Sequence, residues 1–234
     1  MAMDSIALFH QPPSGKPLVY ISACLLGERV RYDGDQKQLP RDSLAVLQKQ
    51  LQLRGICPEV GAGLSVPRPP VQLTRTGQAL RAIGRNDPNL DVTEPLQRYA
   101  DESLMQAQQA QPCGYVLKAR SPSCGLGSTP VFDSSGELID HGNGFQADAY
   151  QAQLPWLLFI EETALASVEN CQRYSELCQL MDGIQRGMGQ RHELLSHYRQ
   201  QGLYIDCKDD DSNTAVLLAC KQALLKHYRL LQVS

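Results

Sequence analysis

The chain has 234 residues, of which 42% are hydrophobic and 20% charged, with a net charge of −3 and a pI near 5.9. This composition is typical of a soluble globular protein and gives no broad basic surface for DNA or an anionic membrane, although a local basic patch is compatible with it. No apolar run approaches the roughly 18 residues that span a bilayer, and the N-terminus lacks the pattern of a signal peptide. We therefore expect a cytoplasmic protein whose eight cysteines bind metal, act in catalysis or are buried, and do not form disulfides.

The N-terminal part of the chain predicts a loose leader and then the first strand and helix of a folded domain. Residues 1–16 show no periodicity, whereas residues 17–23 form an almost continuous apolar run, typical of a strand buried on both faces. A helix is expected to start at Asp42 or Ser43, because leucines then recur at helical spacing. Gly55 and Ile56 follow as a short second strand.

The middle of the chain predicts further alternation of strands and helices. Residues 58–75 are crowded with proline and glycine, so we expect a long functional loop without regular elements. The elements expected after it are a helix at 93–111, a strand at 114–119, a hairpin at 131–139 with its turn at 134–136, a short helix after Gly144 and a strand at 156–160. This alternation predicts an α/β fold: a Rossmann-like layered domain with a mainly parallel sheet.

The C-terminal part of the chain is helical in pattern. Helices are expected at 168–182, 184–201 and 213–231, joined by glycines, with acidic residues of the segment 209–213 capping the last one. The predicted organisation is therefore a leader (1–16), an α/β domain (17–165) and an α-helical extension (166–234).

Three cysteines of the α/β domain stand where a predicted strand gives way to a turn: Cys24, Cys57 and Cys124. Since ligands of open α/β sheets bind outside the carboxyl ends of the strands, these thiols are expected to share one site, the alternative being three buried core residues. Tight Cys-x2-Cys pairs and an obvious fourth ligand are both missing, which argues against structural zinc. Three thiolates instead suit an iron–sulfur cluster, and a Cys-Pro sequence such as Cys57-Pro58 recurs in such motifs.

Five linked motifs resemble one family. They are Ser22-Ala-Cys-Leu-Leu-Gly27, Val30-Arg-Tyr-Asp-Gly34, Cys57-Pro-Glu-Val60, Pro67-Arg-Pro-Pro70, and Leu117-Lys118 followed by Ser121-Pro-Ser-Cys-Gly125. In this order and spacing the chain resembles the TudS-type 2-thiouracil desulfurase (desulfidase) family over roughly residues 17–165. The leader and the helical extension lie outside the resemblance.

The resemblance implies a cofactor and a reaction. Cys24, Cys57 and Cys124 would ligate a [4Fe-4S] cluster, loaded by the iron–sulfur cluster assembly machinery, with one iron left open for the substrate sulfur. The implied reaction is non-redox desulfuration of a thiolated pyrimidine, 2-thiouracil giving uracil and hydrosulfide. An open iron would act as a Lewis acid on the thiocarbonyl group.

Three residues beside the cysteines are candidates for catalysis. Glu59, two residues after Cys57, is the candidate general acid/base, the alternative being a turn carboxylate. Ser121 and Ser123 flank Pro122, and either hydroxyl could bond the substrate or a developing oxyanion; the alternative is that both shape the turn. We favour Ser121 over Ser123.

Four polar residues of the same motifs are candidates for substrate binding: Arg31, Asp33, Arg68 and Lys118. Each is expected either to contact the edge of the pyrimidine or to form ion pairs that hold the loops together.

Other classes of function are less well supported. The helical extension carries basic residues that could bind thiolated nucleosides or tRNA, but acidic residues are interspersed, so nucleic acid is not favoured. A nucleophilic role for Cys57 would need a histidine, and none is placed to serve it. The chain has no phosphate-binding loop and no complete dinucleotide fingerprint. The remaining cysteines (113, 171, 178, 207 and 220) are expected to pack in the core.

Overall fold

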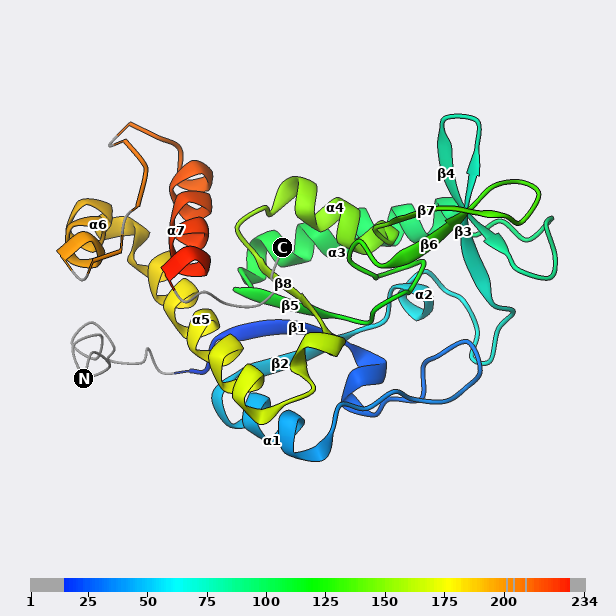
Figure 1. Cartoon of the computed structure of the whole chain (residues 1–234), viewed down its shortest axis with the longest axis horizontal. Coiled ribbons are helices and arrows are strands. Elements are labelled where there is room, and N and C mark those ends of the chain that lie inside the picture. Colours follow the sequence, from blue (N-terminus) through cyan, green and yellow to red (C-terminus); the bar gives the residue numbers. More distant parts are fainter. Residues whose placement is uncertain (1–14, 201, 204, 209, 228–234) are drawn as a thin grey trace.

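The structure is a computed structural model that describes residues 15–200, 202–203, 205–208 and 210–227 (Figure 1). Apart from residues 15 and 16, the predicted leader lies outside these ranges. Within them, no helix combines the length and apolarity that crossing a bilayer requires.

Four strands form a wholly parallel sheet in the order β2-β1-β5-β8. Their bounds are Gln52–Ile56 for β2, Leu18–Ser22 for β1, Gly114–Leu117 for β5 and Leu158–Glu161 for β8. The chain moves from β1 to β2 on one side and later enters β5 on the other side of β1. The order therefore reverses between β1 and β5, and at such a switch point the loops diverge and leave room for a ligand.

Helices cover both faces of this sheet (Figure 1). On one face, Val19 and Ile21 of β1 share a core with α1 (Arg41–Gln50) and α5 (Val168–Gly187). On the other face, Tyr20 packs with residues of α3 (Thr93–Ala110) and α4 (Phe145–Gln153). Because successive side chains of a strand point to opposite faces, one apolar strand serves both cores. The predicted layered α/β fold is confirmed.

A second sheet lies beside the first, in the order β4-β3-β6-β7. It pairs β3 (Val71–Thr76) antiparallel with β4 (Ala79–Gly84) and parallel with β6 (Thr129–Phe132), and β6 antiparallel with β7 (Leu138–Gly142). The hairpin predicted at 131–139 is confirmed as β6 and β7.

The prediction that residues 58–75 contain no regular element is wrong. The segment begins with a short helix, α2 (Pro58–Gly61), because proline fits the first helical turn, where its missing N–H is not needed. It ends inside β3, which starts at Val71 and is stabilised by pairing with β4. A strand that depends on pairing partners is poorly marked in its own sequence.

The C-terminal helices differ from the prediction in two boundaries. Helix α5 runs through Gly183, where a break was expected, because Met181 and Ile184 are fully buried and hold the helix against the core. After it come α6 (Arg191–Gln200) and α7 (Asn213–His227), while the predicted end of α7 at residue 231 lies outside the described residues. The α7 N-terminus is capped by Ser212, whose hydroxyl accepts from the Ala215 N–H at 3.2 Å, rather than by an acidic side chain.

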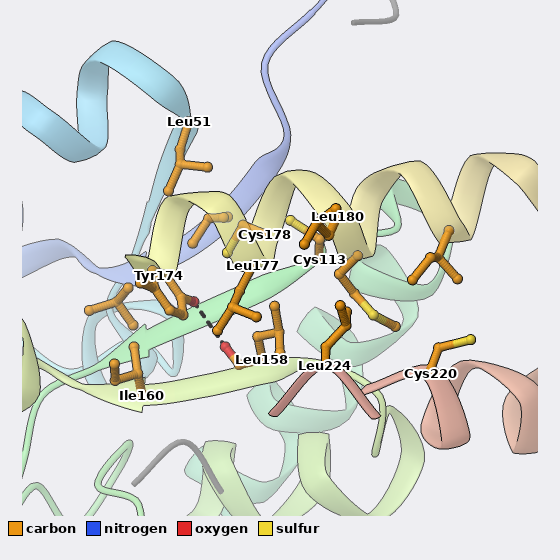
Figure 2. Packing of buried hydrophobic residues seen from close by; sticks show 14 of the residues in the cluster. Leu51, Cys113, Leu158, Ile160, Tyr174, Leu177, Cys178, Leu180, Cys220 and Leu224 are labelled. Carbon is orange, nitrogen blue, oxygen red and sulfur yellow. Dashed lines mark hydrogen bonds between the residues drawn. The ribbon is translucent and has the colours of Figure 1, made fainter. Parts of the chain in front are cut away.

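Helix α5 packs as part of the same core as the parallel sheet (Figure 2). The Tyr174 hydroxyl donates to the Leu158 carbonyl of β8 at 2.9 Å. Cys113, Cys178 and Cys220 are fully buried in this core, as is Cys171, and Cys207 is partly buried. Packing, as predicted, accounts for their placement.

Candidate active site

One cavity of about 410 Å³ lies at the carboxyl ends of the parallel strands, and Cys24, Cys57 and Cys124 all line it. Cys24 lies in a 3-10 helix directly after β1, Cys57 directly precedes α2 after β2, and Cys124 lies in the turn after β5. The switch point of the sheet thus brings together thiols that are far apart in the sequence.

The surroundings of the three thiols disfavour their charged forms. Burial, with smaller contributions from the neighbouring thiols of Cys124 and Cys57, raises the pKa of Cys24 to about 12. Burial also raises the pKa of Cys57 and that of Cys124. Metal ligation requires thiolates, and a bound cation favours them. This donor set is therefore suited to a positively charged ligand that compensates the three thiolates.

The spacing of these donors also bears on the kind of ligand. Among the described residues, no group of three or more His, Cys, Asp or Glu side chains gathers closely enough to hold a single metal ion. The three thiols border the same cavity without converging on one point. A polynuclear iron–sulfur cluster is larger than one ion, and its cysteine ligands need not converge on one point.

Ser22 at the end of β1 contacts one of these thiols. Its oxygen accepts from the Lys118 N–H at 3.0 Å and lies 3.5 Å from the Cys124 sulfur. Either group can be the donor in this contact with the sulfur. Burial has the largest effect on the pKa of Cys124 and raises it, while hydrogen bonds with Ser121 and then Ser22 lower it. Sequence reasoning missed Ser22, although it stands two residues before Cys24.

The two serines of the turn form a chain of hydroxyl groups that ends on Glu59. The Ser123 hydroxyl donates to Glu59 Oε1 at 2.8 Å, and the Ser121 and Ser123 oxygens are 3.0 Å apart. Since a hydroxyl has one hydrogen, Ser121 is the donor to Ser123. The Cys124 N–H donates to Ser121 Oγ at 3.4 Å and is the first donor of this chain of hydrogen bonds. All hydrogens of the chain thus point toward the carboxylate.

Arg68 fixes the other side of Glu59. Its Nε donates to Glu59 Oε2, and both side chains are nearly buried, with 6% of Arg68 and 12% of Glu59 exposed. The Arg68 guanidinium also donates to the carbonyls of Val30 at 2.9 Å and Ser65 at 3.1 Å. Arg68 lies behind the carboxylate and is not part of the cavity lining.

The other predicted binding residues also form ion pairs. Arg31 lines the cavity and pairs at 2.9 Å with Asp33, which is more exposed and lies outside the lining. The hydrogen bond that Arg31 donates to Asp33 raises the pKa of Arg31, and the same bond lowers the pKa of Asp33. Lys118 lines the cavity, and its Nζ donates to Glu162 Oε1 at 2.6 Å and to the Ala119 carbonyl at 2.8 Å.

Cations predominate in the lining. Five basic residues take part (Arg31, Lys37, Arg85, Lys118 and Arg120), against one carboxylate, that of Glu59. This positive surplus suits a site with several thiolates. Sequence reasoning missed Lys37, Arg85 and Arg120; Arg85 directly follows β4, a strand that the sequence did not predict.

Gly144 lets α4 begin directly against the turn that carries Cys124. Its N–H donates to the Gly125 carbonyl at 2.8 Å, and a Cβ at this position would lie 2.5 Å from the Cys124 nitrogen. No side chain fits there without moving backbone. The close approach helps to fix the position of the thiol at the cavity.

The fold and cavity define an α/β protein with a thiol-rich, positively charged ligand site at the switch point of its parallel sheet. The family model of 2-thiouracil desulfurase matches residues 19–162, and the chain belongs to this family. The resemblance seen in the five motifs is thereby confirmed.

Two individual proteins are similar to the chain. It is 30% identical over 139 residues to the uncharacterized protein YbbK of Bacillus subtilis (strain 168), an alignment covering 56% of this chain and 87% of YbbK. Its fold matches the solved structure of the [4Fe-4S]-dependent thiouracil desulfidase TudS with a TM-score of 0.54 and 30% identity, covering 66% of this chain and 96% of TudS.

Proposed function

We propose that this protein is a [4Fe-4S]-dependent desulfidase that hydrolyses a thiolated pyrimidine, converting 2-thiouracil to uracil and hydrosulfide. Family membership and the likeness to TudS support this activity. In this proposal residues 17–165 form the catalytic domain. Helix α5, from the predicted extension, covers one face of its sheet.

The cluster would be held by Cys24, Cys57 and Cys124, after loading by the cluster assembly machinery. The shared cavity, the disfavoured free thiolates and the positive lining support this assignment. When bound through three cysteines, such a cluster supplies an iron without a protein ligand, which polarises the thiocarbonyl group as a Lewis acid.

The residues of the chain supply the proton transfers of the hydrolysis. Water adds to the thiocarbonyl carbon, a C–O bond forms, the C–S bond breaks and sulfur leaves as hydrosulfide, with no net oxidation or reduction. Glu59 takes a proton from the attacking water and returns it to a leaving or ring atom. The hydroxyls of Ser121 and Ser123 carry this proton, since their hydrogen bonds end on the Glu59 carboxylate.

The basic residues of the site position the reactants. Arg68 holds the carboxylate of Glu59 in one orientation from behind. Arg31 and Lys118 line the cavity and offer N–H donors to the acceptor atoms of the pyrimidine. Asp33 contributes by orienting Arg31.

The observation that carries the proposal is the hydroxyl chain from Ser121 to Glu59 beside a cavity lined by three cysteines. The test is anaerobic purification, iron and sulfide analysis, and assay of uracil and hydrosulfide from 2-thiouracil. We expect about four irons per chain, and loss of iron and turnover in Cys24→Ala.

The matched control is Cys207→Ala, which removes a partly buried cysteine outside the cavity lining and should keep both iron and turnover. An active, iron-free protein, or a Cys24→Ala variant with full activity, contradicts the proposal.

A further inference from the structure

Arg120 has an unusual backbone conformation for its residue type. It is one of two non-glycine residues in the described part of the chain with a positive φ, at 61°, the other being Gln111 at 49°. In this left-handed region the Cβ of an L-residue crowds the backbone, which is why glycine is favoured there. An arginine at this position has a conformational cost that a glycine would avoid.

Glu162 holds the two residues before Arg120. One carboxylate oxygen accepts from the Lys118 ammonium at 2.6 Å, and the other accepts from the Ala119 N–H. Both oxygens are thus used, and the pair of Lys118 with Glu162 is shielded, with 17% and 13% of the side chains exposed. The strand end is fixed where the chain turns toward the serines.

Glu161 holds Arg120 through a third residue. Glu161 Oε1 accepts from the Ser128 hydroxyl and from the Leu126 N–H at 2.8 Å. The Ser128 oxygen in turn accepts from the Arg120 N–H at 2.8 Å. Two successive carboxylates at the end of β8 therefore brace residues 118–120 and keep Arg120 in its left-handed conformation.

Arg120 is an exposed residue of the cavity lining. It lines the cavity, and it pairs with no carboxylate among the residues that the structure describes. Two other cations of the lining differ in this respect, because Arg31 pairs with Asp33 and Lys118 with Glu162. A guanidinium offers five N–H donors in a planar fork, and two of them can be accepted by the two lone pairs of one carbonyl oxygen.

We propose that Arg120 is a substrate-binding residue whose guanidinium donates to the ring carbonyl oxygen of the thiolated pyrimidine. Glu161 and Glu162 are positioning residues that hold the turn presenting it. The inference rests on the proposed function for the identity of the substrate. It adds a specificity contact that the motifs of the sequence did not indicate.

The test compares Arg120→Gly with the wild type, both anaerobically purified with intact iron content. Glycine adopts the left-handed conformation without strain, and the substitution also removes the guanidinium. We expect an equal or higher unfolding midpoint, a Kd for 2-thiouracil raised at least about tenfold, and kcat within about threefold. Arg120→Lys keeps the positive charge but lacks the planar fork of donors, so its Kd should lie between those of wild type and Arg120→Gly.

Two comparisons make the test specific. Gln111, the other non-glycine residue in the left-handed conformation, is the C-cap of α3 and lies outside this cavity. Gln111→Gly removes the backbone strain there and should leave the Kd for 2-thiouracil unchanged. With 2-mercaptopyrimidine, which lacks the ring carbonyl, wild type and Arg120→Gly should bind equally.

Because active wild type consumes 2-thiouracil, the Kd values are measured by equilibrium dialysis in the Glu59→Gln background, with and without Arg120→Gly, and this measurement separates the inference from the proposed function. Wild type that binds 2-thiouracil without desulfurating it overturns the function alone, and the Kd comparison still decides the role of Arg120. An unchanged Kd in Arg120→Gly, or no binding by wild type, overturns the inference.

Discussion

Glu59 and Ser123 are 64 positions apart in the chain, yet they share a hydrogen bond of 2.8 Å. Glu59 lies in α2 after one strand of the parallel sheet, and Ser123 lies in the turn after another. The opposite oxygen of Glu59 is bound by Arg68. The carboxylate is therefore oriented from both sides, as a group that transfers protons at one place requires.

Replacing Glu59 with glutamine removes the proton acceptor and keeps the shape. We expect iron content close to wild type and a kcat at least about 100-fold lower, within the range that general acid–base catalysis supplies. Iron analysis and single-turnover assay with 2-thiouracil measure the two effects.

The same substitution leaves the nearly buried Arg68 without its ion-pair partner, which lowers stability. The double variant Glu59→Gln/Arg68→Met removes the unpaired charge and serves as the control. If it recovers stability and stays inactive, Glu59 acts in the chemistry. Recovery of turnover would show that Glu59 only compensates Arg68.

The hydroxyl chain predicts non-additive effects of the two serines. Ser123→Ala cuts the connection between Ser121 and Glu59, so kcat should fall about 10- to 100-fold with unchanged iron content. The kcat of Ser121→Ala should fall by a similar factor. Because both serines act in one chain of hydrogen bonds, the kcat of the double variant should lie within about threefold of that of Ser123→Ala. If the factors by which kcat falls in the two single variants multiply in the double variant, the serines act separately.

Much of the fold and the site could be predicted from local sequence. The strands β1, β5 and β8 have apolar runs, and α1 and α3 have helical spacing. Helix α3 starts at Thr93 as predicted, whereas α1 starts at Arg41, and neither Asp42 nor Ser43 caps it. Cysteines after strands locate the cavity, because parallel strands end at the same edge of their sheet.

What could not be predicted depends on contacts between distant segments. Strand β3 is stable through its pairing with β4 and β6, which its own residues do not specify. Glu161 and Glu162 read as ordinary carboxylates at a strand end, and only the fold places residues 118–128 against them. Arg120 gives no signal in sequence, because its backbone angle is set by these neighbours.

The two carboxylates after β8 should respond differently to the same substitution. Glu162 uses both oxygens, so Glu162→Gln places an NH2 group against a donor and should lower the free energy of unfolding by about 1–3 kcal/mol. Glu161 uses one oxygen for two bonds, which the amide oxygen of Glu161→Gln can still accept. Hydrogen exchange over residues 118–128 should increase in the first variant only. Equal exchange in both variants would contradict this bracing role.

Lys221 of α7 is buried against the sheet, and this burial disfavours its charged form. Its ammonium donates to the Pro155 carbonyl at 2.9 Å and lies 5.5 Å from the centre of the Phe159 ring. Burial lowers its pKa from 10.5 to about 8. Between these two values the unfolded chain binds a proton that the folded chain does not, so this lysine makes stability rise with pH across that window.

Lys221→Met should remove that dependence. The free energy of unfolding of wild type minus that of Lys221→Met should increase by about 1.2 kcal/mol for each pH unit between pH 8.5 and 10, because other titrating groups cancel in the difference. Urea denaturation at several pH values measures it. Lys226→Met, which replaces an exposed lysine of the same helix, is the control for the loss of one positive charge. A constant difference for Lys221→Met would show that burial does not perturb the Lys221 ammonium.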